Sequence, residues 1–358
     1  MTLNDHIREM AIDPAFEREP VADNSAVEMY YKDLQKAIGV EDFPIILVDT
    51  LLKRTYKMTY NGRCFLVFDM YLMEIMRSIN RIILEGCSFA ALDNFFNKII
   101  SEECFVQDYF SAAINFSSNY MNALGVERSD FQQKEQSIAY DYSFIQQAFL
   151  IAHEIFHFYV GNNPDEKTKS LMGKEHFLQY IYQYTNKSDS TAAASMKSII
   201  GNKKMIEECL CDSTAIIHIT DIGKKLGTMD IVDSCLAAAL AVMCQFTLSI
   251  VQKTVKNSGD YSYEDDLNKL NFRIVHLKEF CSYYISEEDS KDSQREYQEA
   301  VEELYHEWMQ RICRPLLYKL FKEKDLFSSE QGLRGMSSEQ IKRVKKVLKE
   351  TYKTMGLI

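Results

Sequence analysis

The chain has 358 residues, of which 46% are hydrophobic, and it carries a formal net charge of −11 at pH 7. This length and hydrophobic content allow one large domain or two modest ones with a substantial buried core. Because binding to phosphates requires a basic surface, the acidic balance argues against DNA or RNA as a partner.

The cysteines and the N-terminus indicate the compartment. Nine cysteines are present, and apart from Cys209 and Cys211 they lie far apart in the chain, which is not the pattern of a disulfide framework. Residues 1–6 include an acid and no apolar run, so no secretory signal is predicted. Both features favour a protein of the reducing cytoplasm.

The early part of the chain predicts a small sheet. Residues 1–43 form a polar segment with helical spacing over 26–38, and Ile45–Val48 is a short β-branched run. The dipeptide Asn61-Gly62 then separates an alternating segment, 54–60, from the apolar run 64–68. Because Asn-Gly accepts the positive φ angles of a type I′ turn, a hairpin and a small antiparallel sheet are expected over residues 45–68.

The rest of the chain predicts helices. Only five prolines are present in the whole sequence, and the few glycines mostly fall between periodic segments. The fold class is therefore mainly α with a small antiparallel sheet (α+β). The helices are expected over residues 71–85, 89–99, 104–123, 138–160, 168–185, 203–222, 231–256, 264–283, 294–322 and 338–354.

Composition also predicts the domain organisation. The acidic, serine-containing stretch 286–293 is the best internal linker, and 327–337 is a second. We therefore expect an N-terminal polar and helical segment over 1–43, a catalytic domain over 44–285 and a C-terminal helical tail over 294–358.

Two segments raise the question of a membrane. The stretch 231–251 is apolar but contains Asp233 and Gln245, which favours a buried core helix over a membrane span. The C-terminal segment 337–358 is basic with an apolar stripe, and Ser337 with Gln340 can form a capping box. This segment can lie on an anionic membrane or on the chain's own acidic body, and the second is favoured, so membrane association is not expected.

The helix over 138–160 contains the strongest chemical motif, His153-Glu154-Ile155-Phe156-His157. Residues four apart lie on one face of a helix, so His153 and His157 can bind one metal ion, while Glu154 lies about 100° around the axis and can reach a water on that ion. The surrounding residues are almost wholly apolar, and buried imidazole and carboxylate groups require partners. One zinc ion with an open position for water is the predicted cofactor.

A third ligand has to come from elsewhere in the chain. The downstream candidates are Glu175, His176, Glu207, Glu208, Asp212 and His218. Glu208 is favoured because it shares a helix face with Asp212, so that one carboxylate can bind the metal while the other accepts the free N–H of a ligand histidine.

These residues resemble the gluzincin type of zincin metallopeptidase, in which HExxH is followed on a later helix by ExxxD. The resemblance implies that His153, His157 and Glu208 bind zinc, that Glu154 is the general base and that Asp212 supports a ligand from behind. The third-histidine metzincin pattern is excluded, since Val160 and Asn163 occupy its glycine and histidine positions. A weaker resemblance is to the bacterial phage-exclusion peptidases. Zincin folds place a small sheet before the active helix, and its edge strand holds an extended peptide.

The predicted activity is hydrolysis of a peptide bond in an intracellular protein or peptide, with Glu154 taking a proton from a water held by zinc. A further donor to the oxyanion is expected, and spacing alone does not choose among the candidates His276, His218, Tyr159, Tyr140 and Tyr142. Two alternatives stay open. One is a non-catalytic zincin-like zinc-binding protein with a regulatory or interaction role, and the other is a membrane-associated protease that uses 231–251.

Overall fold

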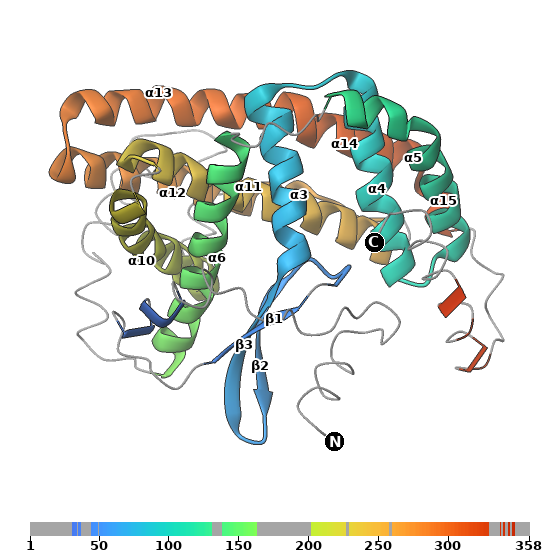
Figure 1. The fold of residues 1–358 in the computed structure, drawn as a ribbon, viewed down its shortest axis with the longest axis horizontal. Helices are drawn as coiled ribbons and strands as arrows, with labels where there is room; N and C mark the ends of the chain where they lie inside the picture. The colour runs from blue at the N-terminus through green and yellow to red at the C-terminus, as the bar shows by residue number, and fades with distance from the viewer. Residues whose placement is uncertain are drawn as a thin grey trace.

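The computed structural model describes residues 31–33, 35–36, 44–48, 50–130, 138–162, 202–226, 229–257 and 260–328, together with several residues between 337 and 347. The predicted helix over 168–185, most of the N-terminal segment 1–43 and most of the predicted C-terminal helix lie outside the described residues. Within the described residues the chain is mainly helical with one small sheet, as predicted (Figure 1).

The sheet contains β1 (Ile45–Val48), β2 (Thr55–Tyr60) and β3 (Arg63–Asp69) in the order β1-β3-β2. Strands β2 and β3 form the predicted hairpin, and its turn residues Asn61 and Gly62 have φ angles of 49° and 76°. Strand β1, however, pairs parallel with β3, so the sheet is mixed rather than wholly antiparallel.

Asp69, at the end of β3, fixes the connection between β1 and β2. The carboxylate of Asp69 accepts hydrogen bonds from the backbone N–H groups of Thr50 at 3.0 Å and Lys53 at 2.9 Å, which lie in the connection after β1. It also accepts one from Tyr71 N–H at 3.1 Å and so caps the following helix. The connection from β1 to β2 is therefore fixed against the end of β3. Strand β1 thus runs parallel to β3.

The helices that follow largely agree with the predicted ones. Helix α3 (Met70–Asn80) continues into the π-helical segment η2 (Arg81–Glu85) and ends at Gly86, whose φ is 76°. Helices α4 (Phe89–Val106) and α5 (Phe110–Asp130) are divided at Asp108, which has a left-handed φ of 65°. The predicted boundary lay several residues earlier, because an aspartate that tolerates left-handed backbone is a weaker signal than glycine.

The second half of the chain supplies the remaining helices. These are α6 (Ile138–Asn162), α10 (Lys203–Leu226), α11 (Ile231–Lys256), α12 (Glu264–Glu288), α13 (Lys291–Trp308), α14 (Arg314–Lys322) and α15 (Lys324–Ser328), with the π-helical segment η3 (Met309–Cys313) joining α13 to α14. Near the C-terminus, the backbone N–H of Ser337 donates to Gln340 Oε1 and that of Gln340 donates to Ser337 Oγ, which is the predicted capping box.

Helix α11 forms the centre of the fold. It contacts α3, α4, α6, α10, α12 and α13, and these helices surround it in Figure 1. It is the one described helix long and apolar enough to cross a membrane, but 83% of its most apolar stretch is buried inside the protein. Such burial is typical of a core helix, because a membrane span would present its apolar side chains to lipid.

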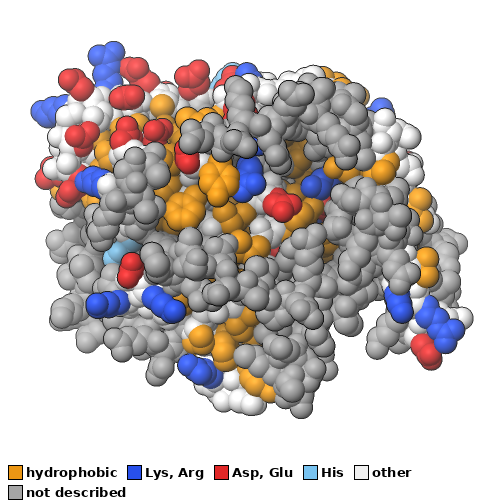
Figure 2. All heavy atoms as spheres, in the orientation of Figure 1, with side chains coloured by type: hydrophobic (Ala, Val, Ile, Leu, Met, Phe, Trp, Pro, Cys, Tyr) orange, Lys and Arg blue, Asp and Glu red, His pale blue; other side chains and the backbone are white. Residues whose placement is uncertain are grey.

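The C-terminal helices share this core. Tyr297, Val301, Leu304 and Trp308 of α13 are buried in the same apolar cluster as α11, and Ser290 caps the N-terminus of α13 directly after α12. The opposite face of α13 is exposed and acidic. Figure 2 shows charged side chains gathered at the upper left, over the end of the molecule where α12 meets α13.

Candidate metal centre

Two neighbouring helices bring three ligand-type side chains together. His153 and His157 lie one turn apart on α6, and Glu208 faces them from α10. One ligand atom from each residue lies within 4.8 Å of the others, so the group can hold a metal ion. The structure thus selects Glu208 for this position from the downstream candidates, while Glu175 and His176 lie outside the described residues.

The spacing of the donor atoms fits a small tetrahedral ion. The Nε2 atoms of His153 and His157 are 3.0 Å apart, and the Glu208 carboxylate oxygens lie 3.3 Å from the first and 3.6 Å from the second. Tetrahedral ligands at about 2.0–2.1 Å from zinc stand about 3.3–3.4 Å from each other. The two Glu208 distances are to different carboxylate oxygens, Oε2 and Oε1, and all three separations lie near this spacing.

The outer nitrogen of each histidine contacts a carboxylate. Nδ1 of His153 lies 2.8 Å from Oδ1 of Asp212, a close ion pair whose N–H direction is not aligned on the oxygen. Nδ1 of His157 lies 3.0 Å from Oε1 of Glu207. The Nε2 atoms face each other and the Glu208 carboxylate, so a metal ion bound here would take the place of any proton on Nε2.

Arg273 of α12 completes the surroundings of the group. Its Nε and Nη2 donate to Oδ2 and Oδ1 of Asp212 at 2.9 and 2.7 Å, and its Nη1 lies 3.7 Å from Glu208. Asp212 is completely buried, and this two-point contact supplies the charge that it needs. Sequence analysis missed Arg273, although an arginine between the buried Phe272 and Ile274 indicates an internal partner.

The same contacts set the protonation of the group. Burial lowers the pKa of His153, but the adjacent Asp212 carboxylate outweighs it and raises the pKa to about 9. Burial raises the pKa of Glu208, yet hydrogen bonds from His153 and His157 hold it well below its usual range. Burial likewise raises the pKa of Asp212, but the positive charges of Arg273 and His153 outweigh burial and lower this pKa to about 2. Two ionised carboxylates thus favour a proton on His153, and binding of a metal ion to this group would release that proton.

Glu154 has the properties of a base beside the metal group. It follows His153 directly on α6, and burial raises its pKa above the ordinary value. A carboxylate whose pKa is shifted towards neutrality accepts a proton more readily than an ordinary one.

The candidate oxyanion donors lie in different parts of the structure. The ring of His276 lies beneath α10, with Nε2 at 3.0 Å from the Cys209 carbonyl oxygen and 2.7 Å from Ser213 Oγ. Burial lowers the pKa of His276 to about 4, so the ring is neutral. His276 therefore acts in helix packing, not as a donor at the metal group.

The other donor candidates have different positions. His218 stacks on Phe156 with ring centroids 5.4 Å apart, two turns beyond Asp212 on α10. Tyr142 donates from its hydroxyl to Asp233 of α11 at 2.7 Å, and the exposed Tyr140 lies under Arg77. Both tyrosines are about three turns or more before His153 on α6 and so are remote from the group. The side chain of Tyr159 falls outside the described part of the chain.

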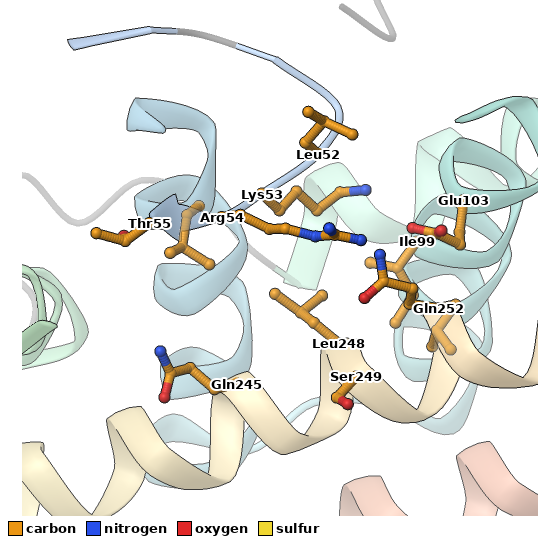
Figure 3. Close-up of a pocket in the computed structure, with 12 residues that line it drawn as sticks. Leu52, Lys53, Arg54, Thr55, Ile99, Glu103, Gln245, Leu248, Ser249 and Gln252 are labelled. Carbon is orange, nitrogen blue, oxygen red and sulfur yellow. The ribbon is translucent and has the colours of Figure 1, made fainter. Parts of the chain in front are cut away.

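In the described part of the chain, cavities of two sizes border α11. The larger, of about 430 Å³, has Glu208 and Arg273 in its wall, and the smaller, of about 180 Å³, lies at the start of β2. Gln245 and Ser249 line both. In Figure 3 the side chains of Lys53 and Arg54 extend across the smaller cavity towards Glu103 and Gln252.

Comparisons with protein-family models, with curated proteins and with solved structures give no match. The chemistry of the metal group is therefore argued from its own residues and geometry.

Proposed function

We propose that this chain is a zinc-dependent metallopeptidase that hydrolyses peptide bonds of an intracellular protein or peptide. The observation that carries the proposal is the group His153, His157 and Glu208, with ligand atoms within 4.8 Å of one another and Glu154 beside them. A structural zinc ion has four protein ligands, whereas the described residues supply three and an adjacent base, which favours a catalytic site.

The donor set supports zinc as the metal. Two neutral imidazole nitrogens and one carboxylate are the ligands of a common class of catalytic zinc site, and the residues match the gluzincin pattern of HExxH and ExxxD. When bound, zinc supplies a Lewis acid that makes a water more acidic and polarises a peptide carbonyl. Asp212 and Glu207 hold the two imidazoles in the orientation that such binding needs.

Glu154 moves the proton in this proposal. Its carboxylate receives a proton from the attacking water and passes it to the nitrogen of the departing amine, so that the base of the first step is the acid of the second. The burial that raises the pKa of Glu154 makes both transfers easier near neutral pH. None of the described donor candidates stands out as a partner for the oxyanion.

Strand β2 supports a path for a peptide substrate. It lies at an edge of the sheet, and it contacts α6, where Lys57 Nζ is 4.7 Å from the ring centroid of Phe158, the residue after His157. An edge strand has unpaired backbone groups that can bind an extended peptide. A peptide added there would run beside the metal group, as the resemblance to zincins implies.

The cytoplasm is the proposed location. All nine cysteines are free thiols, and the apolar helix α11 is buried in the core. Free buried thiols persist in a reducing compartment.

The test compares wild type with Glu154→Gln and with Glu299→Gln, an exposed acid on α13. Each purified protein is assayed for bound zinc and for new N-termini generated in a cell extract. We expect one zinc per chain in all three, with cleavage by wild type and Glu299→Gln and none by Glu154→Gln.

Three results count against this proposal. Absence of zinc from wild type removes its basis. Bound zinc without cleavage supports the alternative of a non-catalytic zinc-binding regulatory or interaction protein. Cleavage that persists in Glu154→Gln overturns the assignment of Glu154 as the base.

A further inference from the structure

The larger cavity lies directly against the metal group. It is an open cavity bordered by the start of α10, the middle of α11 and the first half of α12, and its volume is about 430 Å³. Glu208 and Arg273 belong both to its wall and to the metal group. A volume of this size is typical of a site for a small molecule or side chain, about 300–1,000 Å³.

The wall of this cavity is cationic on an acidic protein. The chain has a net charge of −11, yet four cations and two carboxylates line the cavity. They are Lys204, Lys253, Lys269, Arg273, Glu208 and Asp266.

Three of the four cations contact carboxylates, but Lys253 and Lys269 share one of them within the cavity. Asp266 is shared, because it forms an ion pair with Lys253 and also lies 3.6 Å from Lys269. Lys269 has a second partner in Asp265, but that side chain is 81% exposed, so water screens the pair. Asp212 and Glu208 face Arg273 from the metal side. A metal ion bound by Glu208 would neutralise the negative charge of that carboxylate, and the net charge of the cavity wall would become more positive.

Helix geometry places these lysines close to the metal group. Lys269 lies four residues before Arg273, and Lys204 lies four residues before Glu208, which corresponds to about 6 Å along each axis. An extended peptide advances about 3.3 Å per residue. A substrate side chain within about two residues of the cleaved bond can therefore reach the lysines.

We infer that this cavity is a substrate subsite that takes the carboxylate of an aspartate or glutamate near the cleaved bond. The inference rests on the proposed peptidase function and adds the substrate class. The acidic side chain would displace water between Lys253 and Lys269 and complete the ion pairs that Asp266 shares.

The probes are two pairs of hydroxamates, which bind zinc directly. One pair is N-acetyl-glutamate and N-acetyl-glutamine hydroxamate, and the other carries a glycine between the acyl residue and the hydroxamate. Within each pair the side chains have the same shape and differ in charge. Calorimetry with the zinc-loaded full chain measures each affinity.

We expect the glutamate probe of at least one pair to bind about tenfold more tightly than its glutamine partner. In Lys253→Gln/Lys269→Gln the preference should fall below about threefold with the zinc content unchanged. It should be retained in Lys256→Gln, which removes an exposed lysine from the same helix outside the cavity. The preference should also shrink at high salt.

The outcomes separate the two proposals. Equal affinities within both pairs, or a preference that survives in the double variant, overturns the acid-binding subsite and leaves the peptidase untouched. A lysine-dependent preference in a zinc protein that cleaves nothing overturns the peptidase and keeps an anion site. A chain that holds no zinc overturns both.

Discussion

Replacing Asp212 with asparagine tests how the metal group is supported. The substitution keeps the shape of the side chain but removes the charge that faces Nδ1 of His153 at 2.8 Å and the guanidinium of Arg273 at 2.7 Å. His153 then loses the carboxylate that fixes its tautomer, and Arg273 loses its nearest counter-charge.

The size of the effect follows from burial. Loss of a carboxylate behind a ligand histidine lowers metal affinity by about 10–100-fold, which is about 1.4–2.7 kcal/mol. Asp212 is completely buried, so water cannot replace it, and we expect a loss near the upper figure. Arg273 keeps only the longer contact with Glu208 at 3.7 Å, so the free energy of unfolding of the metal-free protein should also fall by about 3 kcal/mol.

Glu207→Gln is the matched control, because Glu207 contacts the other histidine in the same way but its side chain is 40% exposed. Zinc affinity is measured by competition with a chromophoric chelator, and unfolding by urea. We expect less than about tenfold loss for Glu207→Gln. Asp212→Asn/Arg273→Gln removes both buried charges and should recover stability without zinc affinity. Equal losses in the two single variants would refute the reasoning.

Two further predictions concern the scaffold. Burial lowers the pKa of His276 to about 4, so the stability contributed by the neutral ring is present above the unfolded pKa of 6.5 and is lost as the pH falls towards 4. Relative to His276→Gln, wild type should lose about 3 kcal/mol of unfolding free energy between pH 7 and pH 4, as measured by urea unfolding. Parallel stability curves for the two proteins would contradict this prediction. Trp308 is fully buried and its indole N–H donates to Thr247 Oγ1 at 3.0 Å. Trp308→Ala should therefore lower the free energy of unfolding, measured in the same way, by about 3–5 kcal/mol. The control Tyr318→Ala removes an exposed side chain and should lower it by less than about 0.5 kcal/mol.

Local geometry made part of this molecule predictable. The i, i+4 spacing of His153 and His157 places both on one helix face, and the Asn61-Gly62 dipeptide specifies its turn through positive φ angles. The buried character of α11 followed from composition, because Asp233 and Gln245 disfavour a lipid-facing helix. Each of these rules acts over fewer than about seven residues or over a uniform segment.

Features that depend on long-range packing were not predictable. Arg273 lies 61 residues from Asp212, and no spacing rule relates α12 to α10. The parallel pairing of β1 depends on Asp69 fastening a connection that begins 19 residues earlier. The choice among Glu207, Glu208 and Asp212 followed helix periodicity, but the contact of Glu207 with His157 required knowledge of how α10 crosses α6.

Helix α12 connects the metal group with the cationic cavity. Arg273 and Lys269 lie one turn apart on the same face of this helix, so both line the cavity while Arg273 also contacts Asp212. The two-point contact of Arg273 with Asp212 fixes both the rotation and the position of α12 against α10, and thereby the placement of Lys269 relative to Glu208. Burying this ion pair carries a desolvation cost. In the proposed peptidase, the contact between Arg273 and Asp212 offsets this cost by two effects. It orients the metal ligand His153, and it places Lys269 in the subsite that selects the substrate.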